Sequence, residues 1–106
     1  MDRKRWLLAY ESGDLEIVTC TVDDAPKPYE TGIRHPEYND HQWIIVEVYK
    51  AQPQAEQGHW KWVNTMTKTK PEALHEVGES VLARMLDHFY KGNKAWRTMV
   101  RKKPPT

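Results

Sequence analysis

A chain of 106 residues and 12.5 kDa has the size of one domain, because either half alone would bury too little apolar surface to fold. Its 39% hydrophobic and 29% charged residues exclude an intrinsically disordered chain. The single cysteine, Cys20, excludes an internal disulfide and an all-cysteine zinc site. We therefore expect one domain over residues 1–103 and a frayed tail at 104–106.

The distribution of charge is more informative than the net charge of +1. After Tyr90 the chain carries basic residues and no acid, which hints at an anionic partner. The opening Met1-Asp2-Arg3-Lys4-Arg5 does not have the pattern of a secretory signal, and the apolar runs are too short to span a membrane. We therefore expect a cytoplasmic protein with no membrane partner.

The first two elements are expected to form a β-hairpin. Residues 5–11 and 15–22 are rich in β-prone side chains and flank the turn residues Ser12-Gly13-Asp14. The next segment, 23–28, contains Pro26 and Pro28 and is expected to be a loop, because proline cannot donate to a sheet.

A second hairpin is expected from residue 29 onward. Residues 29–34 alternate apolar and polar side chains, the turn at 35–40 follows, and residues 43–49 have the strongest strand pattern in the chain. Because residues 43–49 have apolar side chains on both faces, we expect a central, buried strand.

A helix is expected over residues 53–66. Pro53 suits the first turn, and apolar side chains then recur at helical spacing. These are Ala55, His59, Trp62, Val63 and Met66. Gly58 weakens the prediction, and a strand over residues 59–63 stays open as the alternative.

A longer helix is expected over residues 70–91, because Thr69 and Glu72 form a capping-box pattern ahead of a 3.6-residue apolar repeat. Asn93 is expected to cap a short helix that contains Trp96, Met99 and Val100. The predicted fold is α+β: a four-stranded, mainly antiparallel sheet of two hairpins, two helices packed on one face and a short C-terminal helix.

Three short motifs follow one another within residues 29–66. They are Tyr29-Glu-Thr-Gly-Ile33, Ile45-Val-Glu-Val-Tyr49, and Ala55-Glu-Gln-Gly-His59 with Val63. The combination resembles small uncharacterised proteins of phages and prophages, in which a Glu-Thr strand, a Glu/Tyr strand and an Ala-x-x-Gly-His helix follow one another. The resemblance implies a phage-related origin and a strand-strand-helix core, and it implies no known activity.

Several residue clusters could carry chemistry, and each has a simpler explanation. His35, Glu37, Asp40 and His41 could bind a divalent metal together with Glu56 and His59, but a polar turn uses the same residue types. Glu30 and Glu47 could form an acid/base pair only if their strands placed them face to face.

His59 alone could transfer a proton, although a histidine on an apolar helix face is usually a hydrogen-bonded core residue. The sequence contains no phosphate-binding glycine loop and no nucleophile elbow. We therefore expect no catalytic residue, no metal ligand and no cofactor, and a protein that is not an enzyme.

Two groups of residues could bind a partner. Trp43, Trp60 and Trp96 are candidate anchors for another protein, and Trp60 and Trp62 should point in nearly opposite directions from one helix. The basic C-terminal residues could instead contact nucleic-acid phosphates, with Trp96 stacking on a base. These are Lys94, Arg97, Arg101, Lys102 and Lys103.

The leading functional hypothesis follows from the expected two-layer fold. Helices on one face would leave the other sheet face partly open, and a second copy of the chain could cover it. We expect a phage-type accessory protein that acts as a non-enzymatic protein-interaction module. It would form a homodimer or bind another protein. The first alternative is a nucleic-acid-binding protein that uses the basic C-terminal segment, and the second is a small metal-dependent enzyme.

Overall fold

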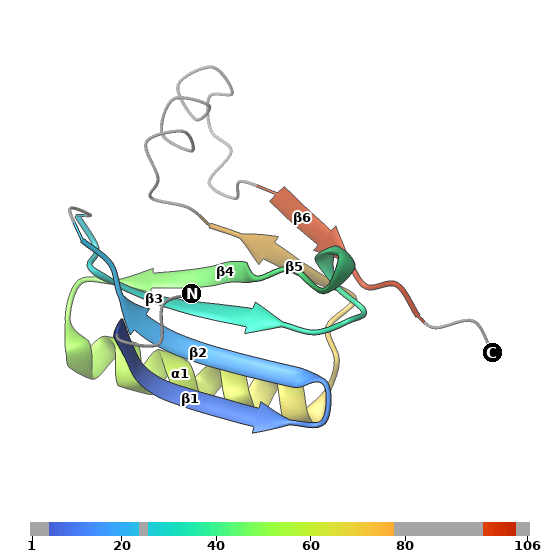
Figure 1. Ribbon diagram of the computed structural model, residues 1–106, viewed down its shortest axis with the longest axis horizontal. Helices are drawn as coiled ribbons and strands as arrows, with labels where there is room; N and C mark the ends of the chain where they lie inside the picture. The colour runs from blue at the N-terminus through green and yellow to red at the C-terminus, as the bar shows by residue number, and fades with distance from the viewer. Residues whose placement is uncertain (1–4, 24–25, 78–96, 104–106) are drawn as a thin grey trace, which may run out of the picture.

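The computed structural model describes residues 5–23, 26–77 and 97–103. A four-stranded antiparallel sheet and one helix packed against it make up most of this part (Figure 1). The strands of the sheet are β1 (Trp6–Ser12), β2 (Leu15–Thr21), β3 (Tyr29–Arg34) and β4 (Ile44–Tyr49). The α+β class and the four-stranded antiparallel sheet are therefore confirmed.

The strands follow one another across the sheet in the order β1-β2-β3-β4. Gly13 has a φ of 58° in the turn between β1 and β2, a conformation that favours glycine. Ser12 pairs with Leu15 beside this turn, so the predicted first hairpin is confirmed. The prediction of a central position for residues 43–49 is wrong, because β4 is the last strand of this sheet.

Helix α1 (Gln52–Lys68) confirms the helix expected over residues 53–66 and rules out the alternative strand at 59–63. Pro53 lies in its first turn, and Ala55, Gly58, His59 and Met66 are buried at helical spacing. The helix packs across the face of β2, β3 and β4 (Figure 1). The N–H of Thr69 donates to the Thr65 carbonyl where the helix ends.

The prediction of a helix over residues 70–91 is wrong for the residues that the structure describes. Residues Ala73–Glu76 form strand β5, which pairs antiparallel with strand β6 (Arg97–Val100). Leu74 and Met99 face each other in this pair and are both buried. The local capping pattern at Thr69 is overridden by this pairing with a distant segment. The rest of the predicted helix, from residue 78 on, lies outside the described residues.

The prediction of a short C-terminal helix is also wrong for its described residues, because Met99 and Val100 belong to β6. Met99 is buried while Val100 is 67% exposed, as expected for neighbours on a strand. Two packed helices on one face are therefore replaced, in the described part of the chain, by one helix and a second, two-stranded sheet. The predicted tail at 104–106 lies outside the described residues.

One apolar core joins both sheets and the helix. It contains Leu15, Ile17, Ile33, Tyr38, Ile44, Val46, Met66, Leu74 and Met99. Tyr38 is fully buried and its hydroxyl donates to the Pro71 carbonyl at 2.5 Å. The N–H of Val77 donates to the Ile45 carbonyl at 2.8 Å, which links the end of β5 to β4. No helix in the described ranges is long and apolar enough to cross a membrane.

Candidate functional site

A chain of buried polar side chains lies between the sheet and α1. The hydroxyl oxygens of Thr19 and Thr31 are 2.6 Å apart across β2 and β3, and Thr19 Oγ1 is 2.8 Å from His59 Nδ1. The Thr31 hydroxyl oxygen is 3.0 Å from the Tyr49 hydroxyl oxygen. Thr19, Thr31 and His59 have no exposed surface, so these hydrogen bonds form in a low-dielectric interior.

The chain of hydrogen bonds ends at the carboxylate of Glu47. The Tyr49 hydroxyl donates to Glu47 Oε1 at 3.0 Å, and so do Lys61 Nζ at 2.6 Å and Trp62 Nε1 at 2.9 Å. Burial alone would raise the pKa of the Glu47 carboxyl group. The hydrogen bonds have the larger combined effect, and the pKa is lowered. Glu47 is therefore ionised at neutral pH.

The Glu47 carboxylate fixes the direction of every hydrogen bond behind it. Tyr49 has one hydroxyl proton and gives it to Glu47, so it accepts from Thr31. By the same argument Thr31 accepts from Thr19, and Thr19 accepts from Nδ1–H of His59. His59 is thus a neutral imidazole with its proton on Nδ1, consistent with a pKa that burial lowers.

The opposite ring nitrogen of His59 is left as an unprotonated acceptor. Nε2 is buried and has no hydrogen-bond partner among the described residues. The expectation that His59 is a hydrogen-bonded core residue is confirmed for one ring nitrogen only.

Gly58 is required by the position of Tyr49. A Cβ atom at residue 58 would overlap the hydroxyl and ring of Tyr49, so no other residue fits unless the Tyr49 side chain, the strand or the helix shifts. Together with Thr31, Glu47, Tyr49 and His59, Gly58 belongs to the motifs on which the phage resemblance rests. All five meet at this one interface.

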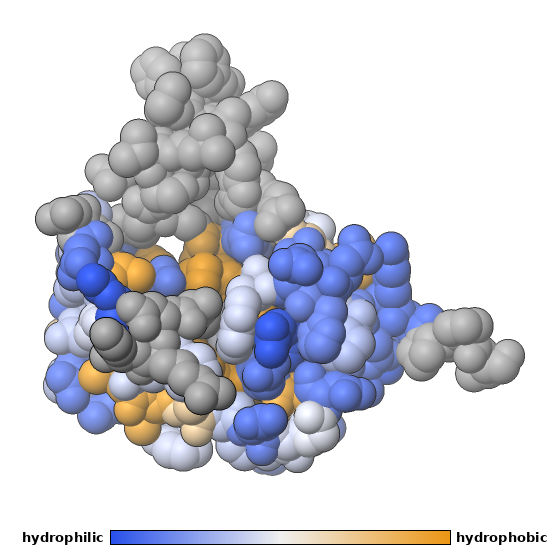
Figure 2. All heavy atoms as spheres, in the orientation of Figure 1, coloured by the Kyte–Doolittle hydropathy of each residue, from blue (hydrophilic) through white to orange (hydrophobic). Residues whose placement is uncertain are grey.

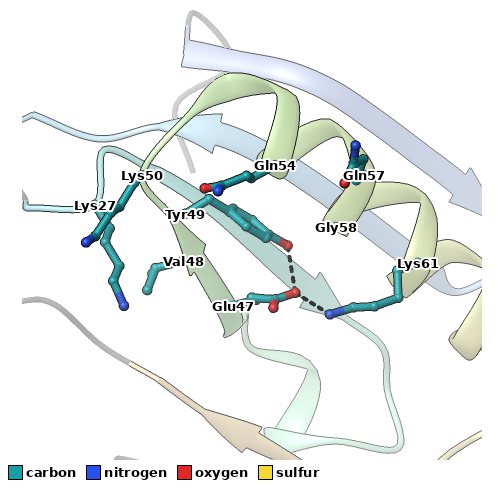
Figure 3. A pocket seen from close by; sticks show the side chains of 9 residues that line it. All are labelled: Lys27, Glu47, Val48, Tyr49, Lys50, Gln54, Gln57, Gly58 and Lys61. Atoms are coloured by element: carbon teal, nitrogen blue, oxygen red, sulfur yellow. Dashed lines mark hydrogen bonds and ion pairs between the residues drawn. The ribbon is translucent and has the colours of Figure 1, made fainter.

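A pocket of about 470 Å³ opens beside this network, between β4 and the first half of α1 (Figure 3). Tyr49 and Glu47 lie at its base, and Lys27, Lys50 and Lys61 lie around it. Gln54 and Gln57 line it from the helix. Lys61 is paired with Glu47, so Lys27 and Lys50 give the pocket a net positive charge.

The predicted acid/base pair does not form. Thr31 pairs with Glu47 and Glu30 pairs with Val48, so the two glutamates point to opposite faces of the sheet. Burial raises the pKa of Glu30, whose carboxylate accepts a weak hydrogen bond from the Cys20 thiol at 3.8 Å. Cys20 is buried, and burial raises the pKa of its thiol to about 12.

The residues of the predicted metal cluster do not converge. Glu37 is buried and ion-paired with Lys70 Nζ at 2.7 Å and Arg101 Nε at 3.2 Å, and the hydrogen bond from Lys70 lowers its pKa. His35 Nδ1 accepts the Glu37 N–H at 3.1 Å, while His59 belongs to the separate network under α1. Within the described ranges no three His, Cys, Asp or Glu side chains are placed to share a metal ion.

The three tryptophans predicted as partner anchors have different environments. Trp60 is 55% exposed, while Trp62 is half-buried against Glu47, so the predicted opposite orientation of the pair is confirmed. Trp43 is half-buried under the Arg34 guanidinium, which lies 5.1 Å from its ring centre. Trp96 lies outside the described residues.

The predicted basic surface is only partly available. Arg101 is used internally by Glu37, and Lys102 Nζ lies 3.6 Å from the Asp40 carboxylate. Lys103 is exposed, Arg97 begins β6, and Lys94 lies outside the described residues. The described C-terminal residues therefore do not form a continuous row of unpaired cations.

Sequence reasoning missed the network and the pocket. The sequence does contain the residues of the network, in the motifs with Thr31, Glu47, Tyr49 and Gly58-His59. It does not reveal the strand register that brings these residues together. Comparison with protein-family models, curated proteins and solved structures gives no match. The phage resemblance therefore stays a prediction.

Proposed function

We propose that this protein is a non-enzymatic interaction module that associates with a second copy of itself through the free edge of β1. The resemblance to phage proteins would make it a phage accessory protein. The observation that carries the proposal is the outer edge of β1, which pairs with no other strand of the described chain.

Strand edges are usually protected, because an unpaired row of N–H and C=O groups can recruit another strand. Strand β1 is seven residues long and contains no proline and no lysine. Its one irregularity lies between Trp6 and Leu8, which leaves the stretch from Leu8 to Ser12 regular. This stretch is a suitable template for a strand from a second copy.

The pairing pattern indicates which groups are available. Ser12 and Leu15 flank a two-residue turn, so hydrogen bonds to β2 should come from Ser12, Tyr10 and Leu8. The backbone groups of Ala9 and Glu11 then point to the open edge. A twofold axis at Tyr10 would pair Ala9 with Glu11 of the second copy and keep the two glutamates apart.

The sheet face that we expected to be open is a weaker candidate for the interface. Val18 and Cys20 point to the face opposite α1, yet they are only 2% and 4% exposed. Association through the edge of β1 does not require an exposed sheet face. It would extend the antiparallel sheet across the two copies.

The test compares Ala9→Pro with Ala9→Ser. Proline removes the outward N–H of residue 9 without touching the hydrogen bonds of Tyr10 to β2, and serine keeps that N–H. We expect sedimentation velocity to show a dimer for wild type and A9S and a monomer for A9P. Circular dichroism would establish that A9P is folded, and a folded, dimeric A9P would contradict the proposal.

A further inference from the structure

We infer that the pocket between β4 and α1 binds the phosphate group of a small phosphate monoester. This inference is independent of self-association, because the pocket lies between β4 and α1 while the edge proposed for self-association belongs to β1. The argument rests on the charge, the uncommitted polar groups and the size of the pocket.

Lys27 and Lys50 are the cations that remain unpaired at this site. Neither forms an ion pair or a hydrogen bond with any other described residue, and both side chains lie at the same end of the pocket (Figure 3). The third lysine, Lys61, is held by Glu47, which also accepts from Tyr49 and Trp62 at the same oxygen. Among the described residues Glu47 forms its ion pair with Lys61 and none with Lys27 or Lys50, so these two lysines stay available to an anion.

The helix supplies further hydrogen-bond donors at the same place. The side chains of Gln54 and Gln57 line the pocket and make no hydrogen bond within the described part of the chain. Helix α1 begins two residues before Gln54, with no side-chain cap and no acid in its first turn, so no acidic side chain of that turn offsets the positive end of the helix dipole. Two lysines, two carboxamides and this helix end favour a compact dianion.

The size of the pocket favours a small molecule over a nucleic-acid strand. A volume of about 470 Å³ lies in the range of small-ligand pockets. A nucleic-acid strand would need an extended row of cations, whereas Lys102 and Lys103 follow β6 at the opposite end of the molecule from the start of α1 (Figure 1). The phosphate group is therefore assigned to a small monoester and not to the backbone of a nucleic acid.

The test is a titration of the full chain with inorganic phosphate, followed by ¹H–¹⁵N NMR at constant ionic strength with chloride as the balancing ion. We expect saturable shifts at Lys27, Lys50, Gln54 and Gln57. Lys27→Gln and Lys50→Gln should each weaken binding by about three- to tenfold, as expected for the loss of one charge-assisted contact at a solvated site.

Lys68→Gln is the matched control, because it makes the same charge change at the exposed far end of α1. Shifts that chloride reproduces, or an equal loss of binding in K68Q, would overturn the inference in favour of general charge screening. Tighter binding of a short single-stranded oligonucleotide than of phosphate, with a steep salt dependence, would overturn it in favour of nucleic-acid binding.

Discussion

At the scale of single residues, the buried chain from His59 to Glu47 is the most constrained part of the molecule. Each hydroxyl has one proton, so the charge on Glu47 determines the donor and acceptor at every step. Removal of one member leaves a neighbour buried without its partner, which costs more than the hydrogen bond itself contributes.

Thr31→Val should therefore destabilise the fold. Valine has the same shape but cannot accept from Thr19, so the Thr19 hydroxyl proton would be buried without an acceptor. We expect the free energy of unfolding in urea to fall by about 1–3 kcal/mol. Thr21→Val, on the half-buried end of β2, is the control and should change it by less than about 0.5 kcal/mol. Equal effects of T31V and T21V would contradict the hydrogen-bond chain.

Gly58→Ala should destabilise α1 although alanine is the better helix former. The new Cβ would overlap the Tyr49 ring, and we expect a loss of about 1–3 kcal/mol from overpacking. Asn64→Ala, at an exposed position of the same helix, should instead be neutral or slightly stabilising. Chemical denaturation measures both, and a G58A protein more stable than wild type would show that Tyr49 does not require a glycine.

Stability should fall when the pH drops below about 6.5, the usual pKa of an unfolded histidine. Burial lowers the folded-state pKa values of His59 and His35, so the unfolded chain binds protons first and is favoured as the pH falls. Glu30 acts in the opposite direction, because burial raises its pKa.

His59→Asn isolates the contribution of His59, because its amide can replace the Nδ1–H donor but does not titrate. Urea midpoints at pH 7.5 and 5.5 should differ less for H59N than for wild type. An unchanged difference would show that His59 does not contribute to the pH dependence.

At the scale of elements, Glu37 connects the β5–β6 pair to the rest of the fold. Its side chain joins Lys70 before β5 to Arg101 after β6, and its carbonyl accepts the Lys102 N–H at 2.7 Å. The N–H of Arg101 also donates to the Glu72 carbonyl at 2.8 Å. The start of β5 and the end of β6, which lie side by side where Ala73 pairs with Val100, are thus held at one buried carboxylate.

Glu37→Gln should loosen this connection selectively. Hydrogen exchange of the β5 and β6 amides is expected to become faster, while the amides of β2 and β3 keep their protection. Glu56→Gln, which removes an acid from an exposed position of α1, is the control. Uniform acceleration across all strands would contradict a local role for Glu37.

The elements also show what the sequence can predict. The first hairpin and α1 could be predicted because their signals are local: a glycine turn at Gly13 and a helical repeat that begins with Ala55. Strand β5 could not be predicted, because its pairing with β6 joins residues more than twenty positions apart. The nearby capping pattern at Thr69 also favours a helix. The end position of β4 depends on strand order, which its apolar pattern does not encode.

The candidate site was predictable only in part for the same reason. His59 was identified as a core residue of its helix, but its contact with Thr19 spans forty positions and depends on how the sheet meets α1. The register between β3 and β4, which includes an irregularity after Thr31, separates Glu30 from Glu47. The pocket depends on that packing as well.

At the scale of the whole molecule, the described part has an α1 layer on one face of the sheet and an apolar core shared with the β5–β6 pair (Figure 1). Figure 2 shows mostly hydrophilic residues on the visible surface, with smaller hydrophobic areas between them. Backbone pairing at β1 requires no large apolar patch, so a mixed surface of this kind is compatible with association through the strand edge.

The solution mass of the wild-type protein, measured by light scattering during size exclusion at low and high salt, tests this account most directly. Pairing through backbone hydrogen bonds and the neighbouring Leu8 and Tyr10 side chains predicts twice the 12.5 kDa chain mass at both salt concentrations. A 12.5 kDa species at every protein concentration would contradict self-association through β1.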